Sequence, residues 1–197
     1  MTAIATAPAA FVGEQAPNFE PDISLEVFLE KYRKGGEDGM KWEWNDGVIE
    51  KTTAMKLKEQ YIVRNLTRRF HTTAAYESRG ELVFELETWT TPVKWRRPDG
   101  AYLTNQQIVD GANGIESMPS FVIEVISKND DINIVINKVD EYFAAGVQVI
   151  WHIFPEQKIV HIYRSLDMIE VCRGEKICSA APVLPDFELK VVDIFKV

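Results

Sequence analysis

One short apolar segment limits the folds open to this chain more than any other. Residues 121–126 read FVIEVI, so an extended strand here would carry apolar side chains on both of its faces. Such a strand is typical of the centre of a sheet that is covered on both sides. The segment therefore predicts a central strand, with the carboxylate of Glu124 in its middle.

The surrounding segments predict a sheet that is covered by helices. Apolar periodicity indicates amphipathic helices over residues 24–34, with Ser24 as N-cap, over 56–80, ending at Gly80, and over 133–146. Alternation favours strands over 81–93, 148–154, 158–165 and 168–174, a last short strand over 184–195, and a hairpin over 41–51 that turns at Asp46-Gly47. The pattern is that of an α/β or α+β fold.

Composition restricts the class of protein. The 197 residues, 46% hydrophobic, predict one domain over 21–197 after a flexible arm over 1–20. The net charge of −8 repels nucleic acid and anionic membranes, which argues against a non-specific DNA coat protein. No apolar run approaches the roughly 20 residues of a membrane span. Cys172 and Cys178 suit reduced thiols, so we expect a cytoplasmic protein.

Two carboxylates suggest a cation site. An ionised Glu124 in an apolar strand costs several kcal/mol unless it is paired, hydrogen-bonded or bound to metal, and pairing with an Arg or Lys is the simplest solution. Asp99 lies in Pro-Asp-Gly, an ordinary turn pattern, but strand-like residues follow it directly. If the two strands are neighbours, the acids converge as ligands for Mg²⁺. Glycoside hydrolysis also uses paired acids, and these residues alone do not decide between the two.

Glu43 is a third acidic candidate. With Asp46-Gly47 as the turn, Glu43 lies opposite Glu50 in the hairpin. Like charges in that position repel, so the pair is either exposed to solvent or held by a cation. The alternation favours exposure, although Glu43 lies between two tryptophans and is also placed to face a cleft.

Hydrolysis of a phosphodiester would also benefit from a lysine near the acids. Lys128 is four residues past Glu124 and is expected to point outward, whereas Lys138 borders the apolar stripe of residues 132–143. Lys138 either reaches the site or extends along the helix edge into solvent. Arg64 and Arg68 share one helical face by their spacing and suit either phosphate binding or a solubilising surface.

The order of these motifs resembles one known family. RRPDGAYL, PSFVIEVIS and NKVDEYFAAGVQVIWHI, with WEWNDGVIE before them and LPDFELKVVDIF after them, resemble the Uma-type restriction endonuclease family of the PD-(D/E)XK superfamily, from about Ser24 to the C-terminus. The resemblance implies a restriction-endonuclease-like α/β fold, a central mixed β-sheet flanked by helices, with an N-terminal helix and hairpin. It implies a Mg²⁺- or Mn²⁺-dependent endonuclease that acts on DNA.

The resemblance also assigns residues. Asp99 and Glu124 match the two metal ligands, and Glu43 matches an early acidic position in the site. The superfamily lysine two residues after the Glu is replaced by Ile126, and Lys138 matches the position to which this family moves it. Arg64, Arg68 and Arg97 are candidates for DNA contact.

Two further interpretations stay open on the sequence. A nucleic-acid-binding or regulatory module on the same fold would fit the low pI and the missing strand lysine, and a third possibility is a protein whose Glu124 merely pairs with a base such as Lys138. A homodimer is expected because endonucleases of this fold cut two strands, and the apolar strands between Val147 and Ile162 are the predicted edge.

Overall fold

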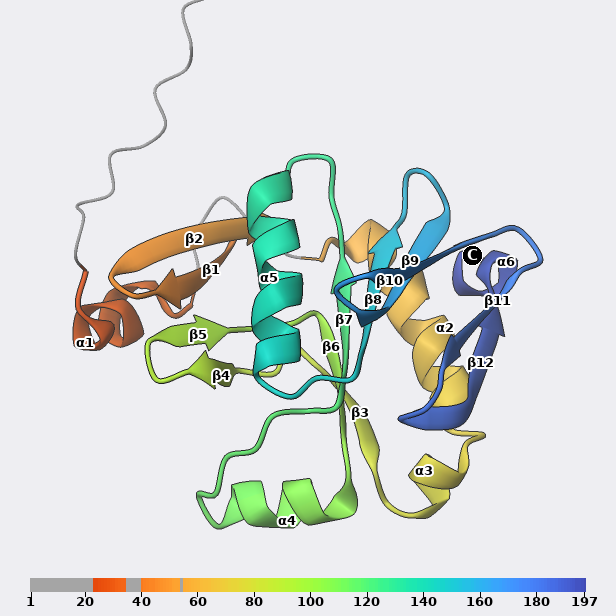
Figure 1. The fold of residues 1–197 in the computed structure, drawn as a ribbon, viewed down its shortest axis with the longest axis horizontal. Coiled ribbons are helices and arrows are strands. Elements are labelled where there is room, and N and C mark those ends of the chain that lie inside the picture. The colour runs from red at the N-terminus through yellow and green to blue at the C-terminus, as the bar shows by residue number, and fades with distance from the viewer. Residues whose placement is uncertain (1–22, 35–39, 54) are drawn as a thin grey trace, which may run out of the picture.

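The computed structural model describes residues 23–34, 40–53 and 55–197 of the chain (Figure 1). The predicted arm over 1–20 lies outside the described residues. The centre of the fold is a six-stranded sheet in the order β10-β9-β8-β7-β6-β3. Within it β7 (Phe121–Val125) and β8 (Val149–Phe154) are parallel, and every other neighbouring pair is antiparallel. The predicted mixed α/β sheet with helices on both faces is therefore confirmed.

The strand that carries Glu124 is central, as the sequence predicts. It lies between β6 (Gly100–Leu103) and β8, and α5 (Ile132–Ala144) connects it to β8. The Phe121, Ile123 and Val125 face packs beneath α2 (Gln60–Phe70), and the Val122 face packs beneath α5. Figure 1 shows these two helices on opposite sides of the sheet.

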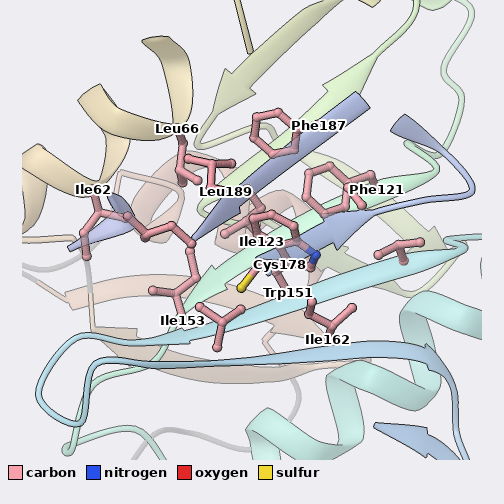
Figure 2. Packing of buried hydrophobic residues seen from close by; sticks show 14 of the residues in the cluster. Ile62, Leu66, Phe121, Ile123, Trp151, Ile153, Ile162, Cys178, Phe187 and Leu189 are labelled. Atoms are coloured by element: carbon pink, nitrogen blue, oxygen red, sulfur yellow. The ribbon is translucent and has the colours of Figure 1, made fainter. Parts of the chain in front are cut away.

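The larger apolar core fills the α2 side of the sheet. Figure 2 shows aromatic and aliphatic side chains from the sheet meeting those of α2 and of β12 (Leu184–Lys190). The rings of Trp151 and Phe187 stack with centroids 5.5 Å apart, and Phe121 packs edge-on against Trp151 at 5.3 Å. This core fixes β7, and with it the position of Glu124.

A second sheet stands beside the first and carries part of the site. Its four strands have the order β2-β1-β5-β4, formed by β1 (Met40–Asn45), β2 (Val48–Thr53), β4 (Thr88–Thr91) and β5 (Lys94–Arg96). The hairpin is confirmed, with Glu43 opposite Glu50. Ser24 caps the N-terminal helix, α1 (Leu25–Val27) with η1 (Phe28–Tyr32), and Phe28 packs on this sheet through Trp95.

Several sequence predictions of element boundaries are wrong. The single helix expected over 56–80 is divided into η2 (Leu57–Glu59), α2 and α3 (Ala74–Glu77). The helix α3 begins anew because the Thr73 hydroxyl caps it, accepting from the backbone N–H of Tyr76. The strand over 81–93 is split between the two sheets, as β3 (Glu81–Phe84) and β4. The last segment ends in α6 (Val191–Ile194).

Other elements were not expected. They are α4 (Asn105–Ala112) and β11 (Ile177–Ala180), which pairs with β12. The predicted dimer edge at 147–162 is also wrong for the described sheet: β8 and β9 (Ile159–Ser165) are internal, and β10 (Met168–Arg173) forms the edge. Among the described residues, no helix is long and apolar enough to span a membrane.

Candidate active site

The two acids that the sequence singles out meet at the junction of the two sheets. Asp99 follows β5 of the smaller sheet and immediately precedes β6 of the larger one. Gly100 pairs with Ile123, so one more step in the same register places Asp99 opposite Glu124. The backbone N–H of Val125 donates to Asp99 Oδ2 at 2.7 Å. Both carboxylates are buried: Asp99 is 2% exposed to solvent and Glu124 is 5% exposed.

A lysine that sequence reasoning missed lies between these acids. Lys41 on β1 is 1% exposed, and its Nζ donates to Asp99 Oδ1 at 2.8 Å and lies 4.0 Å from Glu124 Oε2. A signal was present in the sequence: Lys41 and Glu43 are two residues apart on a strand, so both face the same side.

Lys138 reaches the site from α5 and does not extend into solvent. Its Nζ lies 2.7 Å from Glu124 Oε1 and 3.1 Å from Glu43 Oε1. One helical turn later, the hydroxyl of Tyr142 donates to Glu124 Oε1 at 2.7 Å. The i,i+4 spacing of Lys138 and Tyr142 therefore directs both side chains to one carboxylate oxygen.

Glu43 is buried and held by cations, so the preference for solvent exposure was wrong. Besides Lys138, Glu43 accepts from the backbone N–H of Arg97 at 3.0 Å and from Arg96 Nη1 at 3.3 Å. Arg96 also binds Glu50, across the hairpin, and forms two 2.9 Å hydrogen bonds with Glu141 of α5. The repulsion between Glu43 and Glu50 is thereby offset by one shared guanidinium.

The surroundings hold most of the acids ionised near neutral pH. Burial alone would raise the pKa of Glu43, but Lys138, Arg96 and Lys41 lower it to about 2. Lys138 and Lys41 likewise outweigh burial and lower the pKa of Glu124. Burial, together with Glu124, raises the pKa of Asp99 to about 6 in spite of Lys41. The acids raise the pKa of Lys41 and Lys138 against burial, so both ammonium groups stay charged.

A small cavity of about 20 Å³ opens beside the acids, enough for one water-sized species. Asp99, Glu124, Lys41 and Lys138 line it. Three further residues of its lining, Thr52, Thr53 and His152, each carry a buried polar atom without a hydrogen-bond partner in the described structure. Buried polar atoms are normally satisfied by protein groups or by ordered water.

The donor set fits a hard divalent cation. Mg²⁺ binds commonly through one or two carboxylates, with water and substrate phosphate completing its oxygen ligands. The described residues contain no group of three acidic, histidine or cysteine side chains that would form a complete metal site. Asp99 and Glu124 are two of the acids that line the small cavity, next to Lys41 and Lys138.

A wider cavity of about 180 Å³ shares a wall with the small one. Thr53, Val125 and Ile126 line both. The wider cavity lies at the carboxyl ends of β7 and β8, where open α/β sheets bind ligands. Its other walls include Lys56 and Lys128, and Lys128 is exposed, as expected.

The other basic candidates lie elsewhere. Arg64 and Arg68 belong to α2, on the face of the sheet away from α5; Arg64 donates to the carbonyl of Lys196, and Arg68 lines a separate cavity. Arg97 is next to the site in sequence, but its side chain pairs with Glu85 at 3.1 Å. The structure therefore does not bring Arg64 and Arg68 together with the acids.

The fold recurs in a solved protein. A crystal structure described as "a putative nuclease belonging to DUF820 from Anabaena variabilis" matches 88% of this chain and 97% of its own, with a TM-score of 0.72 and 19% identity. The two chains share one restriction-endonuclease-like fold. The model of the Uma2 family, described as "Putative restriction endonuclease", matches residues 26–192. The chain belongs to the Uma2 family. No curated protein matches it significantly.

Proposed function

We propose that this protein is an endonuclease that hydrolyses phosphodiester bonds of DNA with Mg²⁺ or Mn²⁺. The supporting observation is the convergence of Asp99 and Glu124 on a water-sized cavity that also holds two lysine ammonium groups. Restriction-endonuclease-like families generally use divalent metals, and the donor set here suits one. Family and fold indicate a nuclease; the choice of DNA and of the ion belongs to the proposal.

Each residue of the site has a separate role in this proposal. Asp99 and Glu124 would hold the cation, which when bound polarises the phosphate and lowers the pKa of a water. The backbone N–H of Val125 fixes the orientation of Asp99, and Tyr142 fixes that of Glu124. Glu43 positions the Lys138 ammonium beside Glu124, where it can stabilise negative charge that develops on the phosphate.

The wider cavity provides a path for the substrate backbone. Because it shares a wall with the small cavity beside the acids, a phosphate next to the one that is cleaved would lie within it. Its lining includes Lys56 and Lys128 as well as Glu59 and Glu156, and Lys128 lies 3.9 Å from Glu156 at the surface. We propose that the two lysines contact this neighbouring phosphate.

The test is cleavage of supercoiled and single-stranded DNA with Mg²⁺ or Mn²⁺. Asp99→Asn and Glu124→Gln should each remove nicking and weaken Mn²⁺ binding measured by calorimetry, with circular dichroism spectra unchanged. Asp167→Asn, in the exposed turn between β9 and β10, is the matched control and should cut at the wild-type rate. Undiminished cleavage by either site variant would refute the proposal.

A DNA-binding module without catalysis is the second candidate. It is favoured by Ile126, which stands where the superfamily lysine is expected, and by the ion pair that engages Asp99. DNA binding that survives in both acid variants, with no cleavage by the wild type in either metal, would select it.

We also propose that the protein is cytoplasmic and forms a homodimer. The exposed apolar side chains of the edge strand β10, Met168, Ile169 and Val171, support a self-association surface. A sedimentation mass that stays at 22.5 kDa at high concentration would contradict the dimer.

A further inference from the structure

The ammonium of Lys41 lies between the two acids that would hold the cation. Two of the four acid oxygens are already engaged elsewhere: Asp99 Oδ2 accepts from Val125, and Glu124 Oε1 binds Lys138 and Tyr142. The other two, Asp99 Oδ1 and Glu124 Oε2, lie 2.8 Å and 4.0 Å from Lys41 Nζ. A metal that both acids held through these two oxygens would therefore meet the Lys41 ammonium.

Cations already surround the acids of the cluster. The three most deeply buried acids, Glu43, Asp99 and Glu124, contact three buried cations, Lys41, Arg96 and Lys138. Glu50 and Glu141, which share Arg96, lie at the less buried edge. A divalent ion would add two positive charges next to an ammonium in a site that excludes most water. Charges of the same sign repel strongly in such surroundings, so the ion and the ammonium would compete for the two oxygens.

We propose that Lys41 is an internal counter-ion that holds the cation position between Asp99 and Glu124 in the free protein, and that a divalent cation binds only by displacing it. The inference rests on the metal site of the proposed function. In the free protein Lys41 offsets the desolvation of two buried carboxylates, and it weakens metal binding because its contacts must first be broken.

Lys138 supplies a matched comparison. It is also buried and contacts Glu124, but on Oε1, and its second contact is with Glu43, not with Asp99. Its replacement removes the same charge from the same cluster without freeing the position between Asp99 and Glu124.

The experiment compares four full-length proteins: wild type, Lys41→Met, Lys138→Met and Asp99→Asn. For each protein, calorimetry measures the affinity for Mn²⁺, and thermal unfolding measures the melting temperature with and without Mn²⁺. Lys41→Met should bind Mn²⁺ at least ten-fold more tightly than wild type, and more tightly than Lys138→Met. Its melting temperature should also rise more with Mn²⁺ than that of wild type, since a ligand stabilises the state it binds.

The outcomes separate this inference from the proposed function. If wild type binds Mn²⁺ through Asp99 but Lys41→Met binds no more tightly than Lys138→Met, the counter-ion role is wrong and the metal site stands. If neither wild type nor Lys41→Met binds Mn²⁺, both fail. Should Lys41→Met fail to fold in metal-free buffer, folding restored by Mn²⁺ supports the inference, and no restoration overturns it.

Discussion

At the scale of single residues, the site is a set of buried charges that depend on one another. An unpaired charge in the interior costs several kcal/mol, and each acid here has at least one cationic or backbone donor. Arg96 has the most partners, with carboxylates from β1, β2 and α5 around one guanidinium. It joins the smaller sheet to the helix that carries Lys138.

Removal of Arg96 should therefore destabilise the fold. Arg96→Met leaves Glu43, Glu50 and Glu141 without their shared partner, and we expect a loss of about 3–5 kcal/mol in the free energy of unfolding. Urea denaturation measures it. Arg33→Met is the control, because Arg33 pairs with Glu87 at the surface and should cost far less. Equal losses for the two variants would contradict the role of Arg96.

The sequence was informative about the acids and less so about their partners. Glu124 stood out because an ionisable side chain in a doubly apolar strand needs an explanation, and Asp99 because strand residues follow its turn. Lys41 gave only a weak signal, its shared strand face with Glu43, and Arg96 gave none, because a lysine or arginine in a short strand is usually exposed. Their burial follows from the packing of one sheet against another, which local pattern does not encode.

At the scale of elements, the break between α3 and β3 depends on close packing. A Cβ at Gly80 would lie 2.8 Å from a ring carbon of Tyr102 and 3.0 Å from the carbonyl oxygen of Ala75. Only glycine fits this approach without movement of its neighbours. The sequence predicted that the helix ends at Gly80 because glycine is a common C-cap. The structure gives a second reason, since a side chain at position 80 would collide with Tyr102 and Ala75.

Gly80→Ala should destabilise the protein by about 1–3 kcal/mol through overpacking, measured as a lower melting temperature. Gly111→Ala is the matched control: it lies in α4 with nothing within 4 Å of an added Cβ, and alanine there should stabilise by about 0.5–1 kcal/mol. A neutral Gly80→Ala would contradict the packing account.

Elements with strong periodicity could be predicted, and those set by tertiary contacts could not. The helix α5 and the strands β7 to β10 could be predicted because their apolar residues recur with the period of a helix or of a strand. The division of 81–93 between two sheets depends on which partner strand each half meets, and the helical break at 71–73 depends on a threonine cap inside an otherwise periodic run.

At the scale of the whole molecule, the net charge of −8 must be overcome locally for DNA to bind. The described residues offer two groups of basic side chains: Lys56 and Lys128 in the wider cavity, where Glu59 and Glu156 also lie, and Arg64 and Arg68 of α2 on the other face of the sheet. Proximity to the acids favours the first as the contact nearest the cleaved phosphate.

The double variant Lys56→Gln/Lys128→Gln should raise KM for DNA about ten-fold with kcat little changed. The slope of log binding constant against log salt concentration should fall by the amount expected for roughly two lost phosphate contacts. Arg64→Gln/Arg68→Gln removes the same charge and should change KM less. If the α2 pair has the larger effect, the DNA lies across the α2 face and the proposed path is wrong.

The most direct measurement is Mn²⁺ binding and DNA nicking, on the same preparations, for wild type, Asp99→Asn, Glu124→Gln and the Asp167→Asn control. The account predicts that wild type and control bind Mn²⁺ and nick supercoiled DNA, and that both site variants lose both properties while folded. Wild-type protein that neither binds the metal nor cuts any DNA, or site variants that cut as wild type does, would contradict a metal-dependent nuclease centre at Asp99 and Glu124.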